Sequence, residues 1–196
     1  RFNIFSGKEK TYQAWYGIPE PDLKSGKRTI NYAGKEKPGE PYDNETDNYW
    51  QDHYQLFFDH KFMERITFNT AFFLIRGKGY YEQYKANKKY ADYGLAVPAP
   101  GITRTDLIRQ LWLDNDFYGN VFSLQYNEKK TQATLGGGYS RYSGNHFGEL
   151  IWASKGLPAP AWRWYDLDAL KIDFNIYLKD QTAFAANWYY FYDLQW

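Results

Sequence analysis

Cysteine is absent from this chain of 196 residues, methionine occurs once, and no run of apolar residues is longer than five, as in residues 71–75. The lack of cysteine excludes disulfide scaffolds, thiolate-bound zinc, iron–sulfur clusters and thiol nucleophiles. The short apolar runs exclude a transmembrane helix, which needs about 18 consecutive apolar residues. Net charge is also lacking: 24 Lys and Arg face 23 Asp and Glu, so no basic field attracts nucleic acid.

Aromatic residues, in contrast, are abundant. The chain has 8 Trp, 20 Tyr and 14 Phe, together 21% of its residues. Intrinsically disordered chains have few aromatics and a high net charge, so this composition excludes disorder for the chain as a whole.

Apolar and polar side chains alternate with a period of two, which is the repeat of a β-strand. In residues 66–74 the even positions are mostly apolar, whereas Thr67 and Asn69 between them are polar. The same pattern recurs along the chain and predicts an all-β fold whose strands have one apolar and one wet face. The predicted strands are residues 2–15, 48–60, 66–81, 106–126, 131–152, 170–180 and 188–196.

Two stretches leave alternatives open. Residues 105–113 also fit an amphipathic helical turn, because Leu107, Ile108, Leu111 and Trp112 have helical spacing. After Phe174 the alternation continues, but the strand register is undetermined.

The connections between the predicted strands alternate in length. Residues 61–65, 127–130 and 185–187 form short turns, whereas residues 17–47, 82–105 and 154–169 form long connections that contain all 8 prolines. Transmembrane β-barrels have this bias, with short periplasmic turns and long outer loops, and soluble β-sandwiches do not. Aromatic residues flank both kinds of connection, as in the interfacial girdles of such barrels. The residues expected in these girdles are Tyr16, Tyr49, Trp50, Tyr80, Tyr81, Trp152, Phe62, Tyr126 and Trp188.

Several segments carry a family resemblance. They are residues 47–56 (DNYWQDHYQL), 76–84 (RGKGYYEQY), 107–119 (LIRQLWLDNDFYG) and 136–148 (GGGYSRYSGNHFG), together with residues 2–9 (FNIFSGKE) and 12–19 (YQAWYGIP). These segments resemble the barrel of TonB-dependent outer-membrane transporters of the Bacteroidetes type. The resemblance covers roughly residues 1–155 and implies location in the cell outer membrane.

Length limits what the chain contains. Plugged transporters have 22 strands, which need roughly 220 residues for the spans alone. We therefore expect residues 1–196 to be a partial barrel domain: an antiparallel transmembrane segment of about seven strands, without the plug and the remaining strands.

No catalytic set assembles in the sequence, so we expect no enzyme activity. His53 and His60 are seven residues apart, on opposite faces of one strand, and there is no HExxH motif. Asp114 and Asp116 share a strand face, as a glycosidase pair does, but such a pair also needs a cleft that separates the two pKa values. Residues 136–138, a triple glycine, lack the Lys and Ser/Thr of a P-loop and are interpreted as structural.

Aromatic and arginine side chains in or near the outer loops are the candidates for ligand binding, because rings stack on planar or sugar-like groups and arginine binds carboxylates or phosphates. Loop packing or a girdle is the alternative role. The candidates are Tyr42, Tyr80, Tyr81, Arg104, Arg141, Trp162 and Trp164.

The acidic residues 43–48 offer hard oxygen ligands for Ca²⁺ from Asp43, Glu45 and Asp47, without EF-hand spacing. A solvated acidic loop is the alternative, and no other cofactor is expected.

The resemblance implies active import of a scarce nutrient, such as an iron chelate (siderophore) or a cobalamin-like ligand. Its implied partners are that small molecule, membrane lipid, the TonB complex acting through the absent plug, and a surface lipoprotein. The alternatives are a complete small outer-membrane barrel and a secreted, aromatic-rich β-sandwich that binds carbohydrate.

Overall fold

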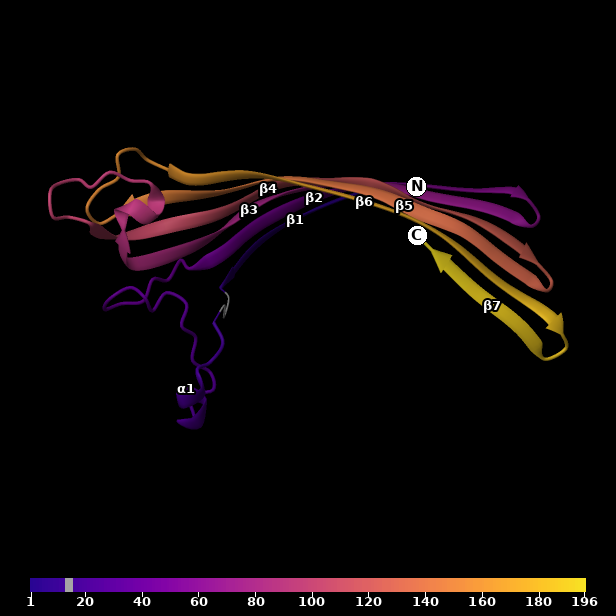
Figure 1. Cartoon of the computed structure of the whole chain (residues 1–196), viewed down its shortest axis with the longest axis horizontal. Helices are drawn as coiled ribbons and strands as arrows, with labels where there is room; N and C mark the ends of the chain where they lie inside the picture. The colour runs from indigo at the N-terminus through magenta and orange to yellow at the C-terminus, as the bar shows by residue number, and fades with distance from the viewer. Residues whose placement is uncertain (13–15) are drawn as a thin grey trace.

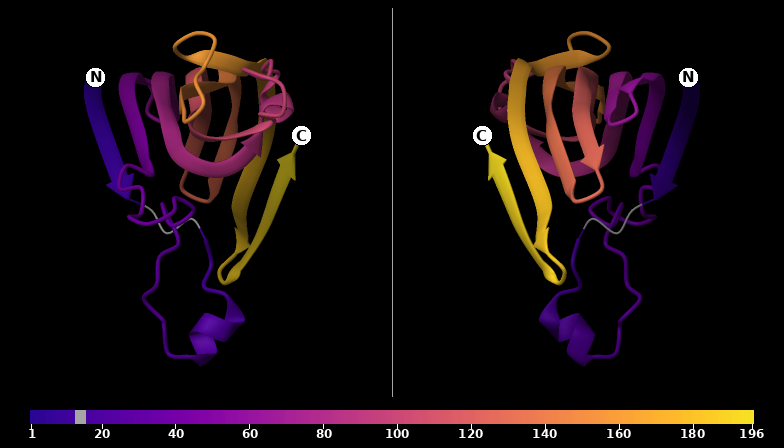
Figure 2. Two further views of the ribbon diagram at one scale, coloured as in Figure 1. Left: turned by 90° about the vertical axis from the view of Figure 1, so that its left-hand side faces the viewer. Right: turned by 90° about the vertical axis from the view of Figure 1, so that its right-hand side faces the viewer.

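A computed structural model describes residues 1–12 and 16–196 as one antiparallel sheet of seven strands in sequential order. The expected all-β fold and its seven strands are thus confirmed. The strands are β1 (Phe2–Tyr12), β2 (Thr46–Met63), β3 (Ile66–Lys89), β4 (Arg104–Glu128), β5 (Thr131–Ala153), β6 (Trp162–Ala185) and β7 (Trp188–Gln195). The sheet is arched along its strands (Figure 1), and β1 and β7 form two separate edges (Figure 2). The predicted continuation of the first strand through residues 13–15 lies outside the described residues.

Short turns and long connections alternate, as the sequence predicts. Residues 64–65, 129–130 and 186–187 make the turns at one end of the sheet. The long connections at the other end contain a short helix, α1 (Glu20–Lys24), and a 3₁₀ turn, η1 (Tyr90–Tyr93). Figure 1 shows these long connections together at the left and the turns at the right. In the described part of the chain, no helix is long and apolar enough to cross a bilayer.

The helical alternative for residues 105–113 is wrong, because these residues lie within β4. Leu107 pairs with Lys85 on one side and Ala153 on the other. The undetermined register after Phe174 is also resolved: Leu178 pairs with Leu135 and Leu194. Pairing on both sides decides the conformation of β4, which local spacing alone does not.

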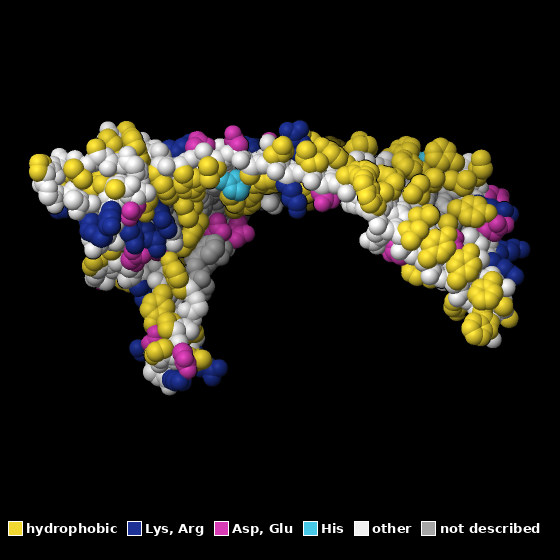
Figure 3. Space-filling model, viewed as in Figure 1, with side chains coloured by type: hydrophobic (Ala, Val, Ile, Leu, Met, Phe, Trp, Pro, Cys, Tyr) yellow, Lys and Arg dark blue, Asp and Glu magenta, His cyan; other side chains and the backbone are white. Residues whose placement is uncertain are grey.

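The two faces of the sheet differ in chemistry. We call the face that carries Phe72, Leu124 and Phe174 the apolar face, and the opposite face, with Asn69 and Ser123, the polar face. Phe72 is 50% exposed and Phe174 53%, so nothing in the described chain covers the apolar face. Hydrophobic side chains gather over the half of the arch near the short turns (Figure 3).

The buried apolar core is small and lies at the long-loop end. Leu107 and Leu150 are fully buried there against Tyr90 and Tyr93 of η1. The connection between β3 and β4 therefore folds back onto the sheet and supplies half of this core. The centre of the sheet has no comparable cluster, which is unusual for a soluble domain, because such a domain buries its sheet against a second layer.

Candidate functional site

Glycines on the polar face leave room for aromatic rings from neighbouring positions. A Cβ on Gly79 would lie 2.7 Å from the Cα of Tyr49, and one on Gly136 would lie 2.5 Å from the Cζ of Tyr177. Rings lying over glycines in this way shield bare backbone in a sheet. The interpretation of the triple glycine as structural agrees with this packing, because the Tyr177 ring occupies the space that a side chain at Gly136 would fill.

We predict that Gly79→Ala lowers the free energy of unfolding by about 1–3 kcal/mol, because the added methyl group collides with the backbone of β2. Chemical denaturation measures this change. Gly7→Ala is the matched control on the same face: its Cβ meets nothing within 4 Å, so stability should not fall. Equal losses in the two variants would contradict the packing role of Gly79.

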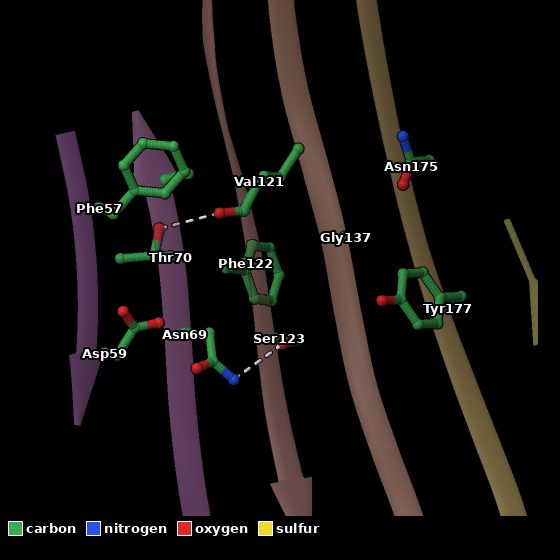
Figure 4. Close-up of a pocket in the computed structure, with 11 residues that line it drawn as sticks. Phe57, Asp59, Asn69, Thr70, Val121, Phe122, Ser123, Gly137, Asn175 and Tyr177 are labelled. Atoms are coloured by element: carbon green, nitrogen blue, oxygen red, sulfur yellow. Dashed lines mark hydrogen bonds between the residues drawn. The ribbon is translucent and has the colours of Figure 1, made fainter. Parts of the chain in front are cut away.

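A first hollow of about 330 Å³ lies in the half of the sheet near the short turns (Figure 4). Asp59, Asn69 and Asn175 bring polar groups to it, and the Tyr177 ring borders it. Asn69 Nδ2 donates a hydrogen bond to Ser123 Oγ at 3.4 Å. Gly136 and Gly138 of β5, which pair with Ser123 and Val121 on this face, carry no side chain that would fill the hollow. The polar face is thus a hydrogen-bonding surface here.

A second hollow of about 280 Å³ lies nearer the long connections and is more aromatic. Tyr49, Tyr81, His146 and Tyr165 line it together with Leu113. Burial raises the pKa of Tyr165, so its hydroxyl stays protonated near neutral pH. This hollow offers ring faces and hydroxyl groups to a small molecule, and it contains few charges.

A tyrosine–histidine pair borders the second hollow. Tyr142 Oη and His146 Nε2 are 2.8 Å apart, and Tyr49 Oη donates to Asn115 Oδ1 at 3.2 Å. Burial raises the pKa of Tyr142, which keeps it a hydrogen-bond donor. Among the described residues the pair contacts no nucleophile or paired carboxylate that would form a catalytic set.

Two of the predicted ligand-binding tyrosines bind buried acids instead of pointing freely outward. Tyr81 Oη donates to Glu45 Oε1 at 3.0 Å, and Tyr42 Oη donates to Glu82 Oε1. Burial, followed by the neighbouring carboxylate, raises the pKa of both tyrosines. Tyr80 lies on the apolar-face side, where its ring centroid is 4.5 Å from that of Trp112.

The other four candidates are dispersed. Trp162 and Trp164 pack against the buried core, and Trp162 Nε1 donates to Tyr93 O at 2.9 Å. Arg104 Nη1 donates to Asn87 O at 2.6 Å, so Arg104 links the outer ends of β4 and β3. Arg141 lies between Tyr118 and Ile172 on the apolar face. The seven predicted residues therefore do not form one site, and of them only Tyr80 and Tyr81 line the second hollow.

The acidic segment proposed for Ca²⁺ has its central carboxylate committed to the protein. Glu45 is buried, and its Oε2 accepts a hydrogen bond from Gly34 N at 2.7 Å. Asp43 is exposed and Asp47 borders the second hollow. Within residues 1–12 and 16–196 no group of three His, Asp or Glu side chains is placed to hold a metal ion. The Ca²⁺ site stays a prediction.

The carboxylates Asp114 and Asp116 lie on the apolar-face side among cations. Lys78 Nζ is 2.9 Å from Asp114 Oδ2, and Arg76 contacts both acids. Burial opposes ionisation of Asp114, but hydrogen bonds from Lys78 and Arg76 outweigh it and lower the pKa. A glycosidase acid needs the opposite shift, so this pair is an ion-pair cluster.

Glu36 and Asp106, which both bind the long-loop end of β3, were not found by sequence reasoning. Glu36 accepts from Lys85 Nζ at 2.8 Å and from Ala86 N at 3.1 Å. Asp106 accepts from Tyr84 Oη at 2.7 Å and from Asn87 N at 2.8 Å. In the sequence, Glu36 and Asp106 are only single acids in polar stretches. Their hydrogen-bond partners lie 19 to 50 residues away along the chain, so no local pattern identifies the contacts.

We predict that acid loosens the contacts of Glu36 and Asp106 with the long-loop end of β3. Burial works against the charge of Glu36, but hydrogen bonds from Lys85 and Lys88 lower its pKa below the usual 4.5. Hydrogen bonds from Tyr84 and Asn87 lower the pKa of Asp106 below 3.8. Because both pKa values are depressed on folding, their stabilisation is complete above about pH 4.5 and is lost as the pH falls through the folded values.

Hydrogen exchange measures this loosening at the amides of Ala86 and Asn87. Their protection should fall below pH 4 while the amides in the middle of β4 stay protected. Glu36→Gln should remove the pH dependence at Ala86 and leave that at Asn87. An unchanged pH dependence at Ala86 in the variant would contradict the role of Glu36.

Comparison of the chain with protein-family models, with curated proteins and with solved structures found no match. The class of protein is therefore argued from the fold and its two faces.

Proposed function

We propose that this sheet is a section of the wall of an outer-membrane β-barrel, and that the barrel imports a scarce nutrient as TonB-dependent transporters do. One observation carries the proposal: the apolar side chains form an uncovered band of constant height across the sheet, and the opposite face is polar. The apolar face contacts lipid, and the polar face lines the interior of the barrel.

The height of the apolar band fits a bilayer. Apolar side chains predominate at alternate positions of residues 66–74 in β3, 118–126 in β4 and 170–178 in β6, nine residues in each strand. The register aligns these segments to within two residues of each other. A tilted transmembrane strand needs about 9–11 residues, so one span fits inside each strand. The strands continue for many residues beyond the band at the long-loop end.

The open edges support a larger wall. The outer backbone edges of β1 and β7 have no strand partner among the described residues. Unpaired N–H and C=O groups cost several kcal/mol each in lipid, so a membrane sheet must close. Further strands therefore complete the barrel on both sides. The single sheet argues against the β-sandwich alternative, which needs two packed sheets, and its open edges argue against a small barrel closed by these strands alone.

The polar face supports transport rather than catalysis. Its two hollows offer hydroxyls, amides and aromatic rings, and the described residues assemble no catalytic set there. We infer that the second hollow, near the outer loops, contacts the nutrient, and that the first faces the plug. An iron chelate or a cobalamin-like compound remains the proposed ligand class, and the TonB complex supplies the energy through the plug.

Uptake by cells tests this function. Cells that express the complete protein should accumulate one radiolabelled nutrient from a panel of ferric siderophores and cobalamin. Accumulation should stop when the gene for TonB is deleted or the proton gradient is collapsed. Tyr81→Phe and Tyr165→Ala should reduce uptake, whereas Tyr177→Phe, in the first hollow, should not. Accumulation that is independent of TonB would assign the barrel to passive diffusion.

A further inference from the structure

We propose that Arg141 binds the phosphate of an acidic membrane lipid at the long-loop edge of the apolar band. This inference rests on the proposed function, because it requires the apolar face to contact a bilayer. It adds a lipid site that is separate from the two hollows of the polar face.

Arg141 interrupts the apolar face at its upper limit. It pairs with Tyr118 of β4 and Ile172 of β6, and Tyr139 is the next residue on the same face of β5. Ser143, the following residue on this face, pairs with Asp116 and begins the charged part of the sheet. Arg141 is thus at the boundary between apolar and charged residues, which is the level of lipid headgroups in a membrane.

The guanidinium has no partner in the described chain. Its Nε is buried without a hydrogen bond, and no carboxylate of the described residues pairs with Arg141. The acid next above on the neighbouring strand, Asp116, has Arg76 Nη1 at 3.6 Å. Arg141 is half-buried, so its guanidinium is within reach of an acceptor from outside the chain, and a buried Nε–H without any acceptor nearby is costly.

The surroundings favour a lipid over a free anion. A guanidinium binds phosphate through two parallel N–H bonds. Tyr118 lies directly opposite Arg141 in the ladder, with Cβ atoms about 5 Å apart, so its hydroxyl can reach the same headgroup. Ile172 beside Arg141, together with Tyr139 and Phe174 below it, is between 38% and 56% exposed, and these side chains offer a surface for an acyl chain. A soluble phosphate would contact only Arg141 and Tyr118 and would leave the apolar surface uncovered.

Spin-labelled lipids test the inference. The complete protein is placed in phosphatidylcholine vesicles that contain a trace of spin-labelled phosphatidylglycerol or phosphatidylcholine, and the motionally restricted fraction of each label is measured. The wild type should prefer phosphatidylglycerol, and Arg141→Gln should reduce this preference by about fivefold, the effect of one basic residue at an anionic surface. Arg141→Lys should retain part of it, because the charge stays and the bidentate geometry is lost.

Lys171→Gln is the matched control. Lys171 precedes Ile172 in β6, so it has the same charge and nearly the same height as Arg141 but lies on the polar face. This variant should keep the wild-type preference. If motionally restricted lipid is present but Arg141→Gln keeps the full preference for phosphatidylglycerol, the inference about Arg141 is overturned, whereas the proposal of a barrel wall is not. If no restricted lipid is seen at all, the proposed function itself fails. Competition by inorganic phosphate would assign the site to a soluble anion and overturn the inference.

Discussion

Replacing Leu124 by Arg is expected to destabilise the protein in a bilayer by about 2–4 kcal/mol, because under the proposed function the charge enters a lipid-facing band near its middle. Leu124 is 40% exposed on the apolar face and pairs with Phe68 and Leu135. Phe72→Arg, on the other side of the middle of the band, should act similarly. The measurement is the folding equilibrium of the complete protein in lipid vesicles, titrated with denaturant.

Thr134→Arg is the control for this prediction. Thr134 pairs with Gln125, the residue after Leu124, and so has almost the same height on the polar face. The charge then enters the wet interior and should cost less than about 1 kcal/mol, in the range of ordinary surface substitutions. Equal costs on the two faces would contradict the assignment of lipid and interior.

Truncation of the buried core at the long-loop end is expected to have an effect of similar size. Leu107→Ala should cost about 2–5 kcal/mol, because the side chain is fully buried and its neighbours cannot refill the space. The loss should release the connection between β3 and β4, since Tyr90 and Tyr93 pack on the same core. Limited proteolysis within residues 94–103, together with equilibrium unfolding, measures both effects.

Leu113→Ala, on the same strand and the same face, is the matched control. Leu113 is 41% exposed, so its truncation should cost less than half as much and should leave the loop resistant to protease. If the two variants behave alike, the buried core does not hold the loop on the sheet.

The sequence predicts the apolar band of the strands well and the ends of the strands near the long connections poorly. In residues 66–74 the strand pattern depends on apolar alternation, which is present wherever one face meets an apolar environment. β3 continues to Lys89 through mostly polar residues, and β6 begins at Trp162, where the alternation changes phase between Trp164 and Tyr165. Backbone hydrogen bonds to the neighbouring strands stabilise these ends. Backbone pairing of this kind does not require apolar side chains at alternate positions, so the sequence of a single strand does not reveal it.

Face assignment in the candidate site was available from the sequence but was not used. Tyr80 and Tyr81 are adjacent in a strand, so their side chains must lie on opposite faces. Tyr49 and Tyr81 line the polar face and cannot belong to an outward girdle. The contact between Tyr81 and Glu45, in contrast, joins residues 36 positions apart through a loop, and no local pattern predicts it.

Site-directed spin labelling along β4 tests the central claim most directly. Residues 1–196 have no cysteine, so a single cysteine placed in turn at each position from 118 to 126 of the complete protein, with any cysteine outside these residues replaced by serine, carries the label. In vesicles, labels at even positions should be accessible to oxygen, with a maximum near Phe122, and labels at odd positions should be accessible to a water-soluble nickel reagent. Uniform accessibility to the nickel reagent, or the opposite alternation, would contradict a membrane wall with its apolar face toward lipid.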